Sequence, residues 1–465
     1  MLINQQDTII APATNSTIAS ALGIVRLSGE KAIEIVAKVF LPKSQKVSSL
    51  LEAKANHTYF GQIFDNQHLI DEVVVCVYKA PHSFTGENLV EITHHGSPFI
   101  SKTIINLLLK NGARLSERGE FSQRAFLNGK INLSQAEAIA DIIASKNKAS
   151  LDLALNQLRG GYNDMLHSLR EKFLHIASLL ELEIDFSEEH EIFVDREQLL
   201  KELDTAKHTL QTLLNSFEQG NAFKNGIPIA IVGKPNSGKS TLLNAILNEE
   251  RAIVSDIEGT TRDTIEERLM INDLEYRFID TAGIRESENT IERKGIERSF
   301  LAIDKAMIVI LLLDLNDKKN LWQEQEKELL KGINIENKAI LRVLNKIDTS
   351  KITEQEIVKL KQEEYIIISA KENLGIDILL KKIEEITPQQ DFTKSLFLTN
   401  ARHYSVMQRA LEEINLSQEG VNNMLSSDLV AENIRMAINY LGQITGEVCN
   451  EDILQNIFSN FCIGK

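Results

Sequence analysis

The stretch at residues 227–247, IPIAIVGKPNSGKSTLLNAIL, decides the fold of the central part of this chain. An apolar, β-branched run leads into Gly233-x-x-x-x-Gly238-Lys239-Ser240, and an amphipathic helical pattern follows. Glycines at these positions let backbone N–H groups surround phosphates at the start of a helix. A glycine–lysine pattern alone can occur by chance in a loop, but the flanking strand and helix favour a phosphate-binding loop. In such a loop Lys239 contacts the β- and γ-phosphates and Ser240 binds Mg²⁺.

Two later motifs follow in the order that a guanine-nucleotide domain needs. FIDTAGI places Asp280 at a strand end near Mg²⁺, and Gly283 where its N–H can face the γ-phosphate. Asn345-Lys346-x-Asp348 follows another apolar strand, and its carboxylate can accept two hydrogen bonds from guanine, which adenine cannot supply. An isolated NKxD is more often a helix cap or a surface turn. Together with the phosphate loop, and with YIIISAK beside the base, it predicts GTP as the ligand.

The stretch at residues 255–267, SDIEGTTRDTIEE, lies where a switch segment belongs. Thr261 is expected to complete Mg²⁺ coordination only when a γ-phosphate is present, which couples nucleotide state to loop order. Ras-like enzymes orient the attacking water with a glutamine just after the DTAG-type residues, but this chain has Ile284 there. No arginine finger is evident, so another residue, a cation or a partner subunit must supply the missing functions. The residues expected to contact GTP are Asn236, Ser237, Gly238, Lys239, Ser240, Thr241, Ser255, Asp256, Ile257, Glu258, Gly259, Thr260, Thr261, Asp280, Thr281, Ala282, Gly283, Asn345, Lys346, Asp348, Ser369, Ala370 and Lys371.

The proline distribution and the hydrophobic spacing outline the other parts of the chain. There is no proline between Pro98 and Pro228 or after Pro388, and long proline-free stretches permit helices. The first hundred residues alternate strand and helix patterns. Helical spacing begins near Leu133 and is expected to stop at Gly220, and it resumes after residue 388. The simplest arrangement is a multidomain chain of α/β plus all-α parts, in which an α/β domain is inserted into a helical domain.

Composition limits the function classes. The chain has 465 residues and a net charge of −15, which disfavours non-specific nucleic-acid binding over the whole surface, although a local basic patch could still bind RNA. Its three cysteines are odd in number and far apart, which argues against a disulfide framework and for a reducing compartment. No apolar run approaches the roughly 18 residues of a membrane span, and no secretion signal is visible. We therefore expect a cytoplasmic protein without a membrane partner.

Along its full length the sequence resembles the MnmE (TrmE) family of tRNA modification GTPases. The resemblance is carried by DTIIAPAT, GIVRLSG, SFTGENLVEI, GEFSQRAFLNGKINLSQAEAIADII, GTTRD and the terminal FCIGK. It implies an N-terminal α+β domain similar to tetrahydrofolate-binding folds, and a helical domain interrupted by a Ras-like P-loop GTPase domain (G domain). The expected domains are 1–130 for folate binding and dimerisation, 131–222 and 388–465 for the two helical parts, and 223–387 for the G domain.

The resemblance also implies how GTP is hydrolysed. The family forms homodimers through its N-terminal domains, and its active sites are completed when G domains pair across GTP. A K⁺ ion then takes the place of an arginine finger, held here by Asn236 and by backbone groups around Ser255, Ile257 and Thr260. The alternative for Asn236 is an amide that stabilises the loop. The water-orienting residue would be Glu292, and the alternative is that it belongs to a solvated run of acids.

A folate site is implied at Arg26, Glu91, Lys130 and Lys465, with 5-formyl- or methylene-tetrahydrofolate as the ligand. Without the family, Arg26 would be an ordinary strand-end arginine and Glu91 an exposed strand residue. The resemblance places Cys462 beside the folate, where an accessible thiolate can act as a nucleophile or an acid. The other interpretation, that Cys462 is a small apolar filler, stays open.

The implied function is a potassium-stimulated GTPase required for tRNA wobble-uridine modification. It would act with a flavin-dependent partner, MnmG, in a heterotetramer, and add a 5-carboxymethylaminomethyl or 5-aminomethyl group at uridine C5. GTP hydrolysis would drive a cycle of G-domain dimerisation, with Glu292, Cys462 and Lys239 as the catalytic residues. The rival hypothesis is an assembly GTPase that binds ribosomal RNA and modifies nothing. It would share the nucleotide motifs but would not need FCIGK.

Overall fold

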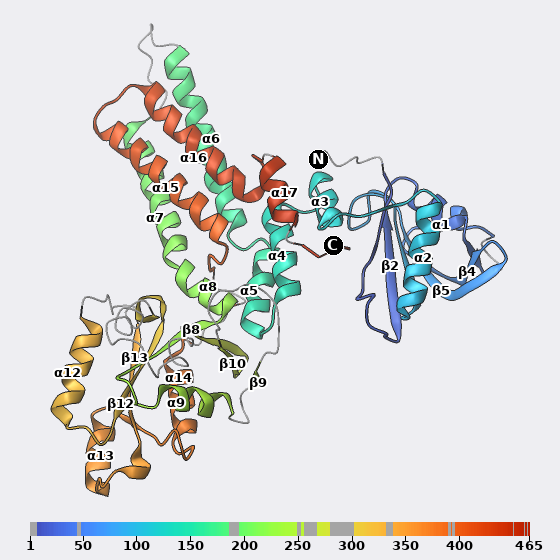
Figure 1. Ribbon diagram of the computed structural model, residues 1–465. Helices are drawn as coiled ribbons and strands as arrows, with labels where there is room; N and C mark the ends of the chain where they lie inside the picture. The colour runs from blue at the N-terminus through green and yellow to red at the C-terminus, as the bar shows by residue number, and fades with distance from the viewer. Residues whose placement is uncertain are drawn as a thin grey trace. The chain divides into compact units, whose positions relative to one another are not determined.

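The computed structural model forms two compact units, the first comprising 1–140, 157–207 and 409–465 and the second 141–156 and 208–408 (Figure 1). Helical segments precede and follow the central α/β segment, as the sequence predicts. The residues that the structure describes are 7–43, 48–185, 195–248, 253–254, 267–279, 302–331, 338–388, 392, 396–449, 451–459, 461–462 and 464–465.

The N-terminal part of the first unit is a seven-stranded sheet in the order β3-β4-β5-β6-β2-β1-β7. Alternation along β5 sets its two faces, because successive side chains in a strand point to opposite sides. Val73, Val75 and Val77 are buried in the core under the helices, whereas Cys76 and Tyr78 lie on the other face. The elements are β1 (Ile9–Pro12), β2 (Leu22–Ser28), α1 (Ala32–Ala37), β3 (Phe40–Pro42), β4 (His57–Asp65), β5 (His68–Tyr78), β6 (Leu89–His95), α2 (Pro98–Lys110) and β7 (Arg114–Leu115).

The helical part of the first unit is built from amphipathic helices. The buried residues of α6 (Asn163–Asp185) recur at three- and four-residue spacing, and α16 (Ser427–Thr445) packs along it. Near the C-terminus, α17 (Glu451–Ser459) packs on α3 (Glu120–Leu127), and Phe458 and Phe461 join a core with Leu133 of α4 (Leu133–Ala144). The end of the chain is thereby held against the segment that follows the N-terminal sheet.

The expected helix end at Gly220 is wrong. The helix α7 (Arg196–Asn215) ends earlier, and α8 (Phe217–Asn225) runs through Gly220. A Cβ atom on Gly220 would lie 2.6 Å from the carbonyl oxygen of Leu398, just before α15 (Ala401–Asn422). The glycine therefore permits a close approach between two segments, and helix termination was the wrong interpretation of it.

The second unit centres on a sheet in the order β14-β13-β12-β8-β11-β10-β9, parallel except at β10 and β9. All six residues of β8 are buried, as expected for a parallel strand covered on both faces. The carboxyl ends of β8, β12 and β13 meet at one edge, where open α/β sheets bind ligands. The elements are α5 (Lys148–Leu158), β8 (Ile227–Val232), α9 (Lys239–Leu247), β9 (Ile253–Val254), β10 (Glu267–Ile271), β11 (Leu274–Phe278), β12 (Ile308–Asp314), α12 (Lys319–Leu330), β13 (Ala339–Asn345), α13 (Glu354–Gln362), β14 (Ile366–Ile367) and α14 (Ile376–Ile386).

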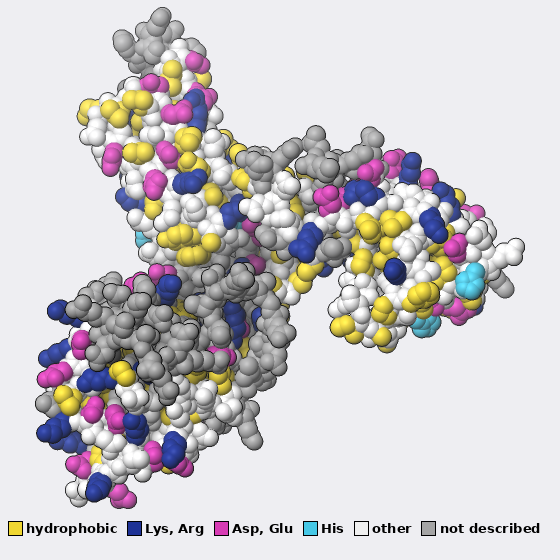
Figure 2. Space-filling model, viewed as in Figure 1, with side chains coloured by type: hydrophobic (Ala, Val, Ile, Leu, Met, Phe, Trp, Pro, Cys, Tyr) yellow, Lys and Arg dark blue, Asp and Glu magenta, His cyan; other side chains and the backbone are white. Residues whose placement is uncertain are grey.

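Two surface observations bear on the expected partners. No helix within the described ranges is both long and apolar enough to cross a membrane. On the face shown in Figure 2, basic and acidic side chains of the described residues are interspersed and do not gather into one basic patch. A basic surface for RNA is therefore not evident on that face.

Candidate functional site

The loop between β8 and α9 has a backbone that only glycine accommodates at two positions. A Cβ atom on Gly233 would lie 2.2 Å from the carbonyl oxygen of Leu312 in β12. Gly238 caps α9 with φ of +96°, and a Cβ atom there would lie 2.3 Å from Nδ2 of Asn345. Asn236, at the exposed tip, also has a positive φ of +63°. The loop is thus drawn tightly against the ends of β12 and β13.

Lys239 is held over this loop. Its Nζ donates hydrogen bonds to the carbonyl oxygens of Gly233 and Lys234, both at 2.9 Å. Burial lowers the pKa of the Lys239 ammonium. A partly buried cation at the start of a helix favours an anion at the same place, where the helix dipole also attracts negative charge.

Asn345 joins the phosphate loop to the SAK segment. Its Nδ2 donates to the carbonyl oxygen of Ser237 at 2.9 Å, and its Oδ1 accepts from the backbone N–H of Ala370 at 2.9 Å. The residue is only 3% exposed. The sequence marks Asn345 as a ligand contact, and the structure gives it a further role as a buried brace between two parts of the site.

Two more pairs fix the base end of the site. Ser369 Oγ donates to Asp348 Oδ1 at 2.6 Å, which orients the carboxylate. Lys346, with φ of +74°, donates from Nζ to Asp314 Oδ2 at 2.7 Å. Burial acts to raise the pKa of Asp314, but this hydrogen bond and the charge of Lys346 outweigh it and hold the pKa below its usual value. Sequence reasoning missed Asp314, although its position at the end of an apolar strand could have indicated it.

These segments enclose a cavity of about 400 Å³, a size typical of small-molecule sites, which are about 300–1,000 Å³. It is lined by Asn236, Gly238, Lys239, Ser240, Thr241, Asn345, Lys346, Asp348, Thr349 and Lys371. Among the described residues that line the cavity, Thr349 is the one that the sequence did not indicate.

Three further predicted contacts, Ser237, Ser369 and Ala370, are buried and are not among the residues that line the cavity. They act behind it, because the backbones of Ser237 and Ala370 bond to Asn345 and the Ser369 hydroxyl bonds to Asp348. The remaining predicted contacts, and the predicted water-orienting residue Glu292, lie outside the described residues: Ser255, Asp256, Ile257, Glu258, Gly259, Thr260, Thr261, Asp280, Thr281, Ala282, Gly283 and Glu292.

A second polar site lies in the first unit, on the face of the N-terminal sheet opposite α1 and α2. The β2–β6 register pairs Arg26 with Glu91, and Nε and Nη2 of Arg26 donate to Glu91 Oε1 at 2.9 and 2.7 Å. The side chains are 18% and 23% exposed, so Glu91 is not the exposed strand residue that the sequence without the family would suggest. The guanidinium carbon of Arg26 lies 5.8 Å from the ring centroids of Phe84 and Phe121, within cation–π range. Arg26 of this ion pair therefore lies beside two aromatic rings.

The C-terminal residues lie beside this ion pair. Burial lowers the pKa of Lys465, and the charge of Arg26 adds to this, while Cys462 and Glu91 act in the opposite direction. The backbone N–H of Phe121, whose ring lies beside Arg26, donates to the carbonyl oxygen of Lys465 at 3.2 Å, which places the end of the chain close to the ion pair. Cys462 is exposed, which does not suit a filler of the core. Lys130 lies beside Gly86, two residues after Phe84, and a Cβ atom on that glycine would be 3.3 Å from Lys130 Cε.

Sequence reasoning missed two neighbours of Glu91. Cys76 faces Glu91 in the β5–β6 register, and Tyr78 is two residues further along the same face. A hydrogen bond with Cys76, together with burial, raises the pKa of Tyr78 to about 12. The alternation with buried valines in β5 indicates that Cys76 and Tyr78 share the opposite face of the sheet. It does not indicate which strand lies next to β5.

Known proteins match the chain along its whole length. The model described as "GTP-binding protein TrmE N-terminus" matches residues 8–130, and "MnmE helical domain" matches 133–462. "tRNA modification GTPase MnmE" of Christiangramia forsetii is 46% identical and covers 99% of this chain and of its own length. The protein of that name from Flavobacterium johnsoniae is 46% identical over 100% of both. A solved structure of Era with 16S ribosomal RNA nucleotides is 28% identical, with a TM-score of 0.27 over 40% of this chain and 66% of that one.

The two family models together span the segments that carry both sites. One family model covers the sheet that carries Arg26 and Glu91, and the other extends across the cavity to Cys462. The predicted fold class, an N-terminal α+β part and a helical part around a GTPase domain, is confirmed. The chain belongs to the MnmE family of tRNA modification GTPases.

Proposed function

We propose that this GTP hydrolase drives modification of the wobble uridine of tRNA, adding a 5-carboxymethylaminomethyl or 5-aminomethyl group at C5. One observation carries the proposal: the end of the chain docks beside the Arg26–Glu91 ion pair. The N–H of Gly119 donates to the carbonyl oxygen of Cys462, and the N–H of Phe121, whose ring lies 5.8 Å from the Arg26 guanidinium carbon, donates to that of Lys465. A thiol, an ammonium and an ion pair on one sheet face form a reactive polar site separate from the nucleotide cavity. An assembly GTPase that only switches between nucleotide states has no use for this second site.

In the nucleotide cavity we assign roles that the residue chemistry supports. Asp348, oriented by Ser369, accepts two hydrogen bonds from guanine. Lys239 neutralises charge that develops on the phosphates, and Ser240, with Thr261, binds Mg²⁺. Glu292 would orient the attacking water.

The arginine-finger role is assigned to K⁺. Asn236 fits it because its amide oxygen is a hard ligand at the exposed tip of the phosphate loop. Backbone groups around Ser255, Ile257 and Thr260 would complete the cation site. When bound, K⁺ would neutralise the negative charge that develops on the phosphates as G domains pair.

The second site is proposed to bind a one-carbon tetrahydrofolate. Both Arg26 donors use Oε1 of Glu91, and no described residue donates to Oε2, so that oxygen is available to N–H groups of a pterin. Phe84 and Phe121 supply apolar walls, and Lys465, with Lys130, supplies positive charge for a glutamyl tail. Cys462 would act as a nucleophile or an acid on the ligand.

The expected partners follow from the family alone. We propose a homodimer through the N-terminal domains, a heterotetramer with the flavin-dependent MnmG, tRNA as the substrate and a cytoplasmic location. The domain limits at 130, 222 and 387 also stay predictions.

The test is the GTPase rate in KCl and in NaCl at matched ionic strength, with the protein concentration varied. We expect strong stimulation by K⁺ that grows with protein concentration, and its loss in Asn236→Ala. Asn244→Ala, on the exposed side of α9, is the matched control and should keep the stimulation. Equal rates in the two salts would exclude the cation site and favour the assembly-GTPase alternative.

A further inference from the structure

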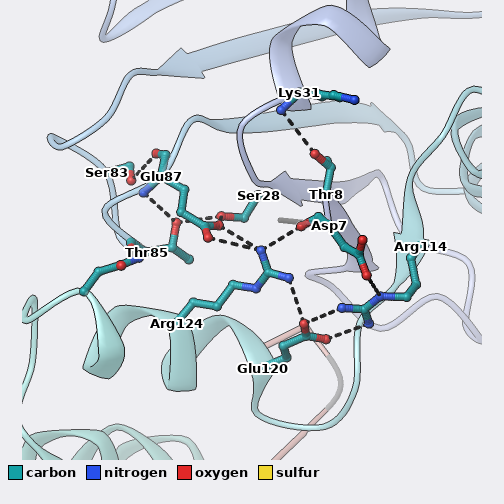
Figure 3. Close-up of polar contacts among 11 residues, drawn as sticks. Asp7, Thr8, Ser28, Lys31, Ser83, Thr85, Glu87, Arg114, Glu120 and Arg124 are labelled. Carbon is teal, nitrogen blue, oxygen red and sulfur yellow. Dashed lines mark hydrogen bonds and ion pairs between the residues drawn. The ribbon is translucent and has the colours of Figure 1, made fainter. Parts of the chain in front are cut away.

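Five charged residues form a network, here called the α3 clamp, at the base of α3: Asp7, Glu87, Arg114, Glu120 and Arg124 (Figure 3). Arg124 donates from Nη1 to Glu87 Oε1 at 3.1 Å and to the carbonyl oxygen of Asp7 at 2.8 Å, and from Nη2 to Glu120 Oε1 at 2.9 Å. Arg114 donates to both oxygens of Glu120, at 2.7 and 3.1 Å. The network therefore joins α3 to β7, to the segment that precedes β1 and to the loop before β6.

The two central members of the clamp have no exposed surface. Glu120 and Arg124 are 0% exposed, and Arg124 Nε has no hydrogen-bond partner among the described residues. Burial alone would raise the pKa of Glu120, but the hydrogen bonds from Arg114, the Glu117 backbone and Arg124 bring it below its usual value. Buried ion pairs add little net stability compared with well-packed apolar residues. Their presence here points to a particular geometry that they maintain.

That geometry is the N-terminus of α3, where the end of the chain docks. The backbone N–H of Gly119 donates to the carbonyl oxygen of Cys462 at 3.4 Å, and that of Phe121 donates to the carbonyl oxygen of Lys465 at 3.2 Å. Glu120 lies between these two donors, so fixing its side chain fixes both N–H groups. Gly119 has φ of +68°, and a Cβ atom there would lie 2.6 Å from the carbonyl oxygen of Phe458.

The terminal residues also contact β1, which the clamp holds through Asp7. Gly464 has φ of +92°, and a Cβ atom on it would lie 2.3 Å from the carbonyl oxygen of Pro12, at the end of β1. The clamp thus connects both elements on which the chain end rests, α3 and β1. Phe121, one residue after Glu120, contributes one of the rings beside Arg26.

We propose that Glu120 and Arg124 are positioning residues for the C-terminal residues. By fixing α3 on the sheet, they hold the N–H groups of Gly119 and Phe121 that dock the chain end beside Arg26 and Glu91. One part of the inference rests on the proposed function, namely that docking serves to bring Cys462 and Lys465 to a one-carbon site. A purely structural role for the clamp predicts lower stability with unchanged docking.

The experiment measures docking directly in the full chain. A nitroxide is attached to Cys462 in a background with Cys76→Ser and Cys449→Ser, and its mobility is read by electron paramagnetic resonance. Arg124→Lys keeps the charge but loses the planar fork that contacts Glu87 and Glu120 together. We expect the mobile fraction of the label to rise several-fold in this variant. Arg435→Lys, in the exposed pair with Glu181, is the matched control and should leave the spectrum unchanged.

Stability and ligand binding are measured on the same variants. An unchanged spectrum in Arg124→Lys, with only a lower unfolding midpoint, would overturn the proposal. If Arg124→Lys does not fold, Glu87→Gln removes a clamp charge at a 15% exposed position and should give the same shift in mobility, and an unchanged spectrum there would overturn it equally. Binding of 5-formyltetrahydrofolate to the chain with all its cysteines is measured separately. Failure of that binding would refute the folate site without touching the docking result.

Discussion

The nucleotide cavity and the site on the N-terminal sheet are assembled in different ways. The cavity draws its residues from the start of α9 and from loops that follow parallel strands at one edge of a sheet. The other site combines neighbouring antiparallel strands, a loop, α3 and the opposite end of the chain. The first is therefore set by local sequence, and the second depends on docking. Substitutions should separate the two, because the sites lie in different compact units.

The largest effect is expected from Asp348→Asn. The amide keeps an acceptor for Ser369 but loses the charge that guanine recognition needs. Two charge-assisted hydrogen bonds of about 1.5–3 kcal/mol each predict that GTP affinity falls on the order of 10²- to 10⁴-fold. Titration with a fluorescent GTP analogue measures this, and xanthosine triphosphate should recover binding. The affinity for folate should stay unchanged in this variant. A parallel loss of folate affinity would show that the two sites are not independent.

The second-largest effect is expected from Asn345→Ala. It leaves the carbonyl oxygen of Ser237 and the N–H of Ala370 without their buried partner, which costs about 1–3 kcal/mol for each unsatisfied group. We expect a lower unfolding midpoint of the second unit, measured by calorimetry, and weaker GTP binding, measured by nucleotide titration. Asn244→Ala, exposed on α9, is the control. Wild-type stability in Asn345→Ala would show that the brace is dispensable.

Arg26→Met tests the other side of the comparison. It leaves Glu91 partly buried without its partner, and we expect 5-formyltetrahydrofolate to bind about 10- to 100-fold more weakly, equivalent to roughly 1–3 kcal/mol. Isothermal titration calorimetry gives the affinity. Arg435→Met, at an exposed ion pair, should change nothing. Unaltered folate binding in Arg26→Met would show that the ion pair does not take part in folate binding.

The smallest effect concerns pH. Burial and the charge of Arg26 lower the pKa of Lys465 below 10.5, so the undocked chain end binds the proton more tightly than the docked one. Docking should therefore strengthen as pH rises from the lowered pKa towards 10.5. Carbon-13 NMR of methylated lysines, with Lys465→Arg for assignment, measures the pKa, and Arg26→Gln should raise it. An ordinary pKa for Lys465 would contradict the juxtaposition.

The same contrast explains what the sequence could predict. Gly238, Lys239 and Asp348 follow local patterns, and the structure places them around one cavity. Gly220 was misinterpreted as a helix end. A glycine is required there because the carbonyl oxygen of Leu398 approaches it closely, and local spacing cannot reveal that contact.

Pairing across the chain was equally hidden from the sequence. The spacing of Glu120 and Arg124 on one helix face was readable, but their partners Asp7 and Glu87 come from other elements. Cys76 beside Glu91 depends on strand register, which alternation alone does not set.

The most direct test of the central claim is nucleoside analysis of tRNA from cells whose only copy of this protein is Cys462→Ser, with GTP turnover of the purified variant measured alongside. We predict loss of the modified wobble uridine while GTP turnover persists, because the thiol belongs to the site on the sheet and the turnover to the cavity. Cys449→Ser should keep the modification. Full modification in Cys462→Ser would contradict the account and leave the C-terminal residues without a chemical role.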